Sequence, residues 1–256
     1  MATRLDSALA ERMGLTRAQA RSLIMEGRVS VNGIPATKAG ANVRDGAEIV
    51  LARPRRFVSR GGEKLERALD VFRIDVTALR ALDVGASTGG FTDCLLQRGA
   101  AHVVAIDVGY GQLAWTLRND PRVTVMERTN FRLLDSHAFP EAFDIVTIDA
   151  SFISLRTIVD RARTFLADSG VIVALVKPQF EAGRERLGRG GVVRDPEVHR
   201  AILREVRDSM TAFGLSATAL VGSPLLGPAG NREFLMQVRR TGEAISNEQI
   251  DAVLEA

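Results

Sequence analysis

A glycine-rich turn between a predicted strand and a predicted helix constrains this chain more than any other feature. The turn spans residues 83–93 and reads Asp-Val-Gly-Ala-Ser-Thr-Gly-Gly-Phe-Thr-Asp. It follows an apolar run over residues 79–84 and precedes a helical pattern in which Phe91 and Leu95 lie about one turn apart. Glycines at such a turn let a ligand approach the backbone at the carboxyl end of a strand. The turn therefore predicts an α/β sheet with a ligand-binding edge, and an ordinary tight turn is the alternative.

The glycine spacing indicates the kind of ligand. A dinucleotide-binding turn carries G-x-G-x-x-G, whereas this turn carries G-x-x-x-G-G, and no Gly-Lys-Ser/Thr follows to hold a phosphate. A nucleoside cofactor that needs no phosphate site, S-adenosylmethionine, fits these residues. Asp107 ends the next apolar run roughly twenty residues on, which is the spacing of a ribose-binding carboxylate.

Two later strands add candidates to this predicted cofactor site. Asn130 follows a strand at residues 123–127, where the adenine edge is expected, with Arg128 and Thr129 as alternatives. Asp149 ends the next predicted strand, at residues 144–148. The candidate cofactor-binding residues are Asp83, Gly85, Ser87, Thr88, Gly89, Gly90, Phe91, Asp107, Asn130 and Asp149.

The composition argues against metal sites and membrane insertion. The 256 residues include one cysteine, Cys94, and three histidines without metal-ligand spacing. No apolar run approaches the ~18 residues of a membrane-spanning helix, and the N-terminus lacks the apolar core of a signal peptide. We therefore expect a cytoplasmic protein that holds no metal and contacts no membrane.

Positive charge is concentrated at the N-terminal end. Residues 1–60 carry 11 Arg and Lys against 5 Asp and Glu, whereas residues 61–256 carry 23 against 26. A basic end on a near-neutral body is typical of a nucleic-acid-binding module, and a solvated arginine-rich surface is the alternative.

Residues 1–52 have the pattern of a small α+β domain. Apolar residues repeat every four positions over residues 5–13 and predict a helix, and a capping box at residues 16–19 begins a second helix. A short alternating run enters Asn32-Gly33, a strong hairpin signal, and a further strand is expected at residues 48–51.

The order of these motifs resembles the S-four RNA-binding domain. The resemblance rests on Arg4-Leu5-Asp6, on residues 16–20 and on residues 24–33. Arg17 and Arg21 lie one turn apart on one helix face, which suits binding to the phosphates of folded RNA. A basic linker is expected at residues 53–60. The candidate RNA-binding residues are Arg4, Arg17, Arg21, Arg28, Arg55, Arg56 and Arg60.

From residue 61 onward, strand-like and helical patterns alternate. Strands are predicted at 79–84, 102–107, 123–127, 144–148 and 170–176, and helices at 91–98, 111–119, 155–167 and 196–213. This alternation predicts a doubly wound, Rossmann-like sheet for residues 61–256. The last two strands, 215–221 and 233–239, are joined by too short a link for a helical crossover, so we expect them to be antiparallel. Tyr110 and Trp115 are expected to contribute to helix packing.

Lysine is scarce in this arginine-rich chain. Of 34 basic residues, only Lys38, Lys64 and Lys177 are lysine. A lysine ammonium can release a proton where its surroundings disfavour the charge, and an arginine guanidinium cannot. Lys177 and Asp149 each end a predicted strand, so we expect both in the crevice that holds the cofactor. Glu233 begins the final strand, and a structural cluster of buried ion pairs is the alternative interpretation.

The order Lys64, Asp149, Lys177, Glu233 resembles the Lys-Asp-Lys-Glu tetrad of ribose 2′-O-methyltransferases of the FtsJ/RrmJ kind. With an S-four domain in front, the whole chain resembles the hemolysin A (TlyA) family of rRNA 2′-O-methyltransferases. The segments that carry the resemblance are residues 59–65, 83–93, 147–154, 175–181 and 190–195. The resemblance implies an S-adenosylmethionine-dependent methyltransferase fold, with the tetrad as catalytic residues. It also implies methylation of cytidine ribose in 16S or 23S ribosomal RNA, with ribosomal subunits as partners.

The residues leave the role of each lysine open. Either Lys64 or Lys177 is a candidate to accept or orient the proton of a ribose 2′-hydroxyl, with Asp149 and Glu233 positioning the ammonium groups. A non-catalytic RNA-binding or ribosome-assembly protein is one rival function, against which the intact glycine turn and the complete tetrad argue. A membrane-lytic hemolysin is a second and weaker rival, because no segment is suited to span or coat a membrane.

Overall fold

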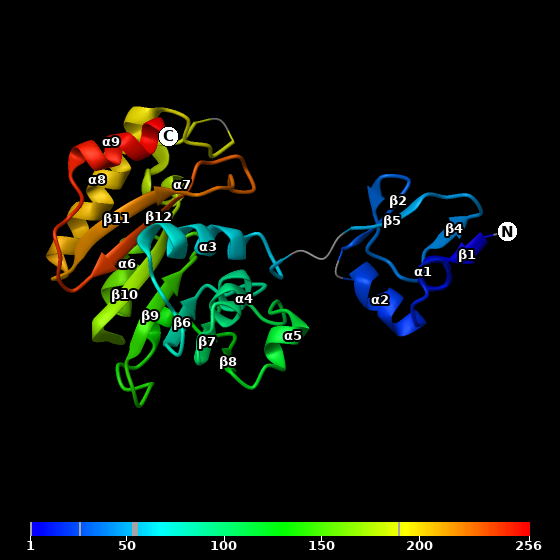
Figure 1. Ribbon diagram of the computed structural model, residues 1–256. Coiled ribbons are helices and arrows are strands. Elements are labelled where there is room, and N and C mark those ends of the chain that lie inside the picture. Colours follow the sequence, from blue (N-terminus) through cyan, green and yellow to red (C-terminus); the bar gives the residue numbers. More distant parts are fainter. Residues whose placement is uncertain (1, 26, 53–55, 189) are drawn as a thin grey trace. The chain divides into compact units, whose positions relative to one another are not determined.

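The computed structural model describes residues 2–25, 27–52, 56–188 and 190–256 (Figure 1). The chain divides into two compact units, Met1–Arg56 and Phe57–Ala256. Residues 53–55 of the expected linker, with the candidate RNA-binding residue Arg55, lie outside the described residues.

The first unit is the predicted small α+β domain. Its helices are α1 (Leu5–Met13) and α2 (Arg17–Met25), and its strands are β1 (Ala2–Arg4), β2 (Val29–Val31), β3 (Ile34–Pro35), β4 (Asn42–Arg44) and β5 (Ile49–Leu51). The order β3-β2-β5 forms one antiparallel sheet, and β1 pairs with β4. The β1–β4 pair was not predicted, because its strands lie far apart in the sequence and no hairpin turn joins them.

Local signals in the first unit are confirmed. The Thr16 backbone N–H donates to Gln19 Oε1 at 2.9 Å, and the Gln19 N–H donates to Thr16 Oγ1 at 3.2 Å, which completes the capping box. Asn32 and Gly33 have φ values of 50° and 77°, the left-handed pair that a type I′ hairpin turn requires.

The second unit is built on a seven-stranded sheet. Its strands are β6 (Arg80–Val84), β7 (His102–Ile106), β8 (Val123–Met126), β9 (Phe143–Ile148), β10 (Leu166–Val176), β11 (Ser216–Gly222) and β12 (Phe234–Arg239). Their order is β11-β12-β10-β9-β6-β7-β8. β12 runs antiparallel to β11, as predicted, and also to β10, a pairing that was not predicted, whereas the pairs from β10 to β8 are parallel.

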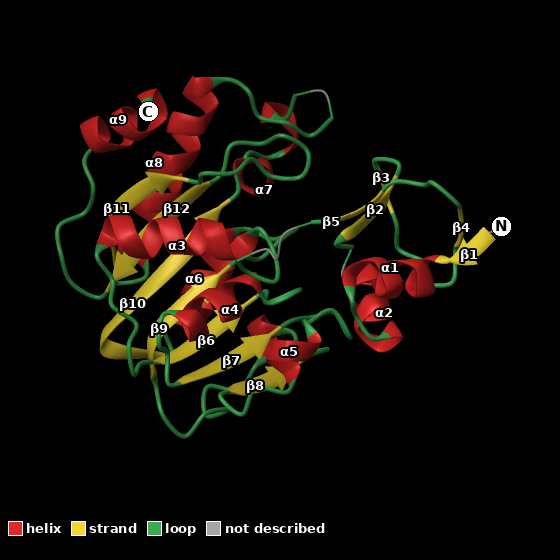
Figure 2. Cartoon of the chain, turned by 45° about the vertical axis from the view of Figure 1, so that its right-hand side comes forward, coloured by secondary structure: helices red, strands yellow, loops and turns green. Residues whose placement is uncertain are grey.

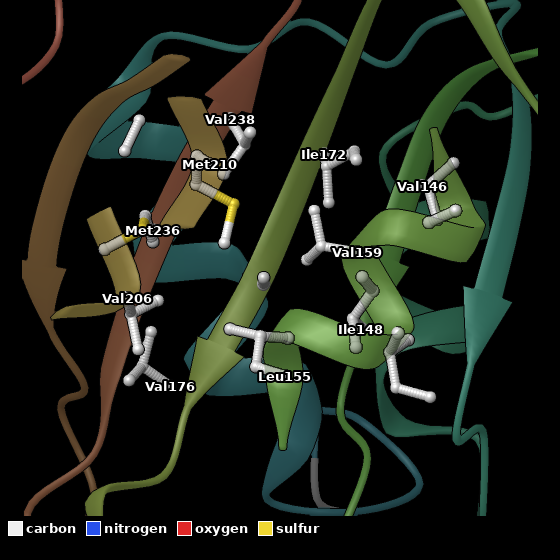
Figure 3. Packing of buried hydrophobic residues seen from close by; sticks show 14 of the residues in the cluster. Val146, Ile148, Leu155, Val159, Ile172, Val176, Val206, Met210, Met236 and Val238 are labelled. Carbon is white, nitrogen blue, oxygen red and sulfur yellow. The ribbon is translucent and has the colours of Figure 1, made fainter. Parts of the chain in front are cut away.

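Helices cover both faces of this sheet (Figure 2). They are α3 (Gly61–Phe72), α4 (Gly90–Gln97), α5 (Trp115–Arg118), α6 (Leu155–Ala162), α7 (Pro178–Glu181), α8 (Pro196–Ala212) and α9 (Asn247–Glu255), with 3₁₀ turns η1 (Phe131–Leu133) and η2 (Arg184–Arg186). Because side chains alternate along a strand, Leu82 packs in one core with α6, α8 and α9, and Ala81 packs in another with α3, α4 and α5. Figure 3 shows part of the first core, where Val146 and Ile172 of the sheet lie near Val159 of α6. The doubly wound architecture is therefore confirmed.

Two predicted helices are shorter than expected. The helix expected at 155–167 ends at Ala162, because residues 163–165 form a turn and β10 begins at Leu166. The helix expected at 111–119 is the four-residue α5. Among the described residues, no helix is long and apolar enough to cross a membrane.

Candidate functional site

A cavity of about 480 Å³ opens at the carboxyl edge of the sheet, within the size range of ligand pockets. Five of the candidate cofactor-binding residues line it, namely Gly85, Ser87, Asp107, Asn130 and Asp149. The other five, Asp83, Thr88, Gly89, Gly90 and Phe91, belong to the same turn but do not line the cavity. The predicted set therefore separates into residues at the cavity wall and residues behind it.

The glycines of the turn have different structural roles. Gly85 has a φ of 84°, and a Cβ there would lie 2.7 Å from the Asp149 carbonyl oxygen, so only glycine lets the two loops approach this closely. A side chain at Gly89 would collide with Leu117 of α5, and one at Gly90 with the Ser59 hydroxyl. Gly85 thus shapes the cavity wall, whereas Gly89 and Gly90 permit close packing behind it.

Asp107 is held in a fixed orientation at the cavity. Its carboxylate accepts hydrogen bonds from the backbone N–H of Ser87 at 2.7 Å and of Gly109 at 2.6 Å. Both bonds leave further lone pairs on the carboxylate for hydroxyl donors. Asn130 also lines the cavity, and its side-chain oxygen accepts from the Arg132 N–H at 3.2 Å to cap η1.

Asp83 lies behind the turn, fully buried. The hydroxyl of Thr92 donates to it at 2.6 Å from α4, and that of Thr147 donates at 3.0 Å from β9. Burial raises the pKa of Asp83 to about 6. Its place in the structure is therefore a buried link between β6, β9 and the start of α4.

We expect Asp83→Asn to stabilise the second unit at pH 7.5 by about 1–3 kcal/mol and to bring no gain near pH 4. The pKa of Asp83 in the folded state, about 6, lies above its value of 3.8 in the unfolded chain. Between these two pH values the folded protein therefore binds more protons than the unfolded chain. The wild type therefore loses stability as pH rises through that window, and the amide variant does not. Thermal melting of both proteins as a function of pH measures the effect, and parallel curves would contradict it.

The four tetrad side chains form two ion pairs, one partly buried and one buried. Lys177 Nζ lies 2.5 Å from Asp149 Oδ1 and donates to Ser151 Oγ at 2.9 Å. Lys64 Nζ of α3 lies 2.5 Å from Glu233 Oε2, and these two side chains are 9% and 1% exposed. Exclusion of water strengthens each pair.

The strand register brings the two pairs to one edge of the sheet. Val176 of β10 pairs with Phe234 of β12, so Lys177 and Glu233 are the next residues at the ends of these adjacent strands. β9 lies on the other side of β10, and Asp149 follows its last residue. Asp149 lines the cavity and contacts Lys177 directly, whereas Lys177 does not line the cavity itself, so its place in the crevice stays a prediction.

The second unit exposes the aromatic side chains of Phe152, Tyr110 and Trp115. Phe152 lines the cavity, is 91% exposed and has a φ of 65°, which is unusual for a residue other than glycine. The prediction that Tyr110 and Trp115 contribute to helix packing is wrong, because they are 68% and 75% exposed. The pattern misled because α5 is too short to bury them. The Tyr110 ring instead contacts the Arg128 guanidinium, 4.0 Å from its centre.

In the first unit, a buried carboxylate brings two candidate RNA-binding arginines together. Asp6 is 2% exposed, and its Oδ2 lies 2.7 Å from Arg4 Nη2 and 3.3 Å from Arg17 Nε. Hydrogen bonding to Arg4 holds the pKa of Asp6 far below its usual range. Arg21 is exposed on the same helix as Arg17. Sequence reasoning missed this role of Asp6, although Arg4-Leu5-Asp6 was part of the recognised motif.

The remaining RNA-binding candidates are placed separately. Arg28 donates from Nη2 to the Ala52 carbonyl at 3.3 Å. Arg56, the last residue of the first unit, is exposed. Arg60 is also exposed and precedes α3 in the second unit.

The doubly wound sheet, the glycine turn and the carboxyl-edge cavity define a Rossmann-like enzyme class that binds nucleoside cofactors. Residues 57–240 match the family model described as FtsJ-like methyltransferase, and residues 3–49 match that of the S4 domain. The chain belongs to the FtsJ-like methyltransferase family and is an enzyme of that kind.

Individual relatives extend over nearly the whole chain. The 16S/23S rRNA (cytidine-2′-O)-methyltransferase TlyA of Mycobacterium tuberculosis is 46% identical over 258 residues, which cover 99% of this chain and 96% of that relative. Hemolysin A of Brachyspira hyodysenteriae is 38% identical, with coverage of 86% and 92%. The solved structure of a protein named a hemolysin from Streptococcus thermophilus matches with a TM-score of 0.77 at 43% identity and covers 99% of this chain and 94% of its own. The resemblance inferred from the motifs is confirmed.

Proposed function

We propose that this protein transfers a methyl group from S-adenosylmethionine to the 2′-hydroxyl of a cytidine in ribosomal RNA. The observation that carries the proposal is the presence of two ion pairs, the partly buried Lys177–Asp149 and the buried Lys64–Glu233, at the carboxyl edge of the sheet where the cavity opens. The named activity of the Mycobacterium tuberculosis relative supports the choice of reaction and substrate.

The cavity residues fit the proposed cofactor. Asp107, held by two backbone N–H groups, is suited to accept hydrogen bonds from both ribose hydroxyls. Gly85 lies in the cavity wall, where its backbone is open to the methionine part, and Asn130 and Thr129 line the cavity and are suited to the adenine edge. Arg128, the other alternative, does not line the cavity and contacts Tyr110. S-adenosylmethionine supplies an already activated methyl group on its sulfonium.

The tetrad is suited to prepare the hydroxyl. A ribose 2′-hydroxyl is a poor nucleophile, and its proton must leave as the new bond to carbon forms. Lys177 or Lys64 orients or accepts this proton, and Asp149 and Glu233 hold the two ammonium groups in place. The other requirement is placement of oxygen and methyl carbon in line, which rigid strand ends provide.

The first unit supplies RNA binding in this proposal. Its exposed arginines, Arg17 and Arg21 foremost, contact phosphates of folded RNA, and the S4 match supports this role. Intact ribosomal subunits are the proposed substrate form.

Methyl transfer to purified ribosomal subunits tests the proposal directly. Small and large subunits are incubated separately with the protein and radiolabelled S-adenosylmethionine, and the label is mapped by nuclease protection and mass spectrometry of nucleosides. We expect label in 2′-O-methylcytidine. RNA binding without any label would instead support a non-catalytic assembly protein. Titration with S-adenosylmethionine separates the enzyme from such a protein, because a non-catalytic protein is not expected to bind the cofactor.

We expect Asp107→Ala to weaken S-adenosylmethionine binding by about 1.5–3 kcal/mol, the range for hydrogen bonds to a charged group. Isothermal titration calorimetry measures this loss. Asp120→Ala is the matched control, because Asp120 pairs with Arg122 and does not line the cavity. Unchanged affinity in the Asp107 variant would remove this residue from the cofactor site.

A further inference from the structure

Helix α6 begins at Leu155 without a capping bond from its own first residues. Ser154 has the extended backbone of an N-cap, but its side chain caps no backbone N–H of the helix. Glu181, the last residue of α7, accepts two hydrogen bonds there, from the Leu155 N–H at 2.6 Å and from the Ser154 hydroxyl at 2.8 Å. A carboxylate at this point satisfies a free N–H and interacts favourably with the positive end of the helix dipole. The Glu181 side chain is 3% exposed, so water has little access to these bonds.

Glu181 also lies one turn from a tetrad residue. Lys177 is the N-cap of α7, and Glu181 is the last residue of that helix. Lys177 contacts Asp149 and Ser151 at the start of the segment 149–155. Glu181 binds the end of the same segment, at Leu155. The rings of Phe152 and Phe180 lie 5.2 Å apart between these two points. The segments 149–155 and 177–181 are therefore joined at both ends and in the middle.

The 149–155 segment needs external support. Phe152 has a positive φ and is almost fully exposed, so it adds backbone strain and buries little surface. Strained backbone of this kind persists only where the surrounding structure holds it. The buried Glu181 carboxylate is a contact that can do so, because it fixes the residue at which the loop becomes a helix.

We propose that Glu181 is a positioning residue for methyl transfer, which holds the 149–155 segment so that Asp149 meets Lys177 and the cavity wall keeps its shape. Glu181 does not line the cavity, so it acts through this segment and not on the reacting atoms. The inference rests on the proposed function, because it concerns the rate of that reaction.

Four variants test the proposal by single-turnover methylation at saturating cofactor and RNA. Glu181→Ala is expected to lower the rate about 10- to 100-fold, as a small misplacement of reacting groups does, with affinities for cofactor and RNA within ~3-fold of wild type. Glu181→Gln keeps an acceptor for the Leu155 N–H and is expected to restore most of the rate. Ser154→Ala removes one of the two hydrogen bonds to Glu181, and its rate is expected to lie between those of Glu181→Ala and Glu181→Gln. Glu205→Ala is the control. Glu205 pairs with Arg156 and Arg186, two arginines that also contact Glu181, but it makes no hydrogen bond or ion pair with residues 149–155.

Hydrogen exchange of the full chain gives a readout independent of activity. The Leu155 amide and its neighbours in 149–155 are expected to exchange faster in Glu181→Ala and to match wild type in Glu205→Ala. An unchanged rate in Glu181→Ala, a loss no larger than in Glu205→Ala, or unchanged exchange would overturn the inference. If wild type transfers no methyl group while exchange responds as expected, the proposed function fails, and the result supports only the structural part of the inference, that Glu181 holds the 149–155 segment. If Glu181→Ala does not fold, the ranking of wild type, Glu181→Gln and Ser154→Ala decides the question.

Discussion

Replacing Lys177 by arginine is expected to lower the single-turnover rate of methylation about 10²- to 10⁴-fold, the range for loss of a positioned proton-transfer group. Arginine keeps the positive charge but cannot give up its proton, and its planar guanidinium is larger than an ammonium. Lys177 Nζ lies between Asp149 Oδ1 at 2.5 Å and Ser151 Oγ at 2.9 Å, and its side chain is 10% exposed. The site therefore has little room for a bulkier cation. Affinities for S-adenosylmethionine and RNA are expected to stay within ~3-fold of wild type.

Two further lysine variants show whether the tetrad lysines act in catalysis or only stabilise the fold. Lys64→Arg is expected to be similarly inactive, because Lys64 is buried against Glu233. Lys38→Arg is the matched control, since Lys38 is the third lysine of the chain and is exposed in the first unit. Thermal melting is measured alongside the rates. A purely structural ion pair would lose stability more than rate, and near-normal rates in both tetrad variants would contradict the tetrad assignment.

Local patterns in the sequence predicted most of the fold. The capping box at Thr16 and the Asn32-Gly33 turn each depend on a few adjacent residues, and each forms as expected. The alternation of strands and helices likewise predicted the sheet, since burial on both faces gives continuous apolar runs. Helix length was less predictable, because apolar residues at 155–167 fit a helix and a strand equally well and tertiary pairing with β9 decided between them.

The candidate site was only partly predictable. Strand-end positions correctly brought Asp149 to Lys177, because parallel strands end at one edge of the sheet. Long-range contacts carry no local signature. The bond from Glu181 to the start of α6 spans 26 residues, and nothing near Glu181 indicates it. Asp83 and Asp107 looked alike in sequence, since each lies at or near the end of a strand. In the structure Asp83 lies within β6 and is buried, whereas Asp107 follows the last residue of β7 and lines the cavity.

Deleting residues 1–56 is expected to abolish methylation of ribosomal RNA, with a loss of at least ~100-fold in kcat/KM at physiological salt because the phosphate contacts are gone. The remaining unit has two extensive apolar cores of its own and contains every residue of the cavity and the tetrad. It is therefore expected to fold and to bind S-adenosylmethionine with wild-type affinity. Calorimetry, thermal melting and methylation of ribosomal subunits measure the three properties.

The position of the cut matters to this experiment. Phe57 is 3% exposed, it packs against Gly62 at the start of α3, and the Val58 N–H donates to Asp93 Oδ2 at 2.8 Å. A second truncation that removes residues 1–60 is therefore expected to be less stable than the first by about 3–5 kcal/mol, as for the loss of a buried phenylalanine. Full methylation by the protein lacking residues 1–56 would contradict the division of labour between the two units. Equal melting temperatures for the two truncations would show that Phe57 contributes nothing to the second unit.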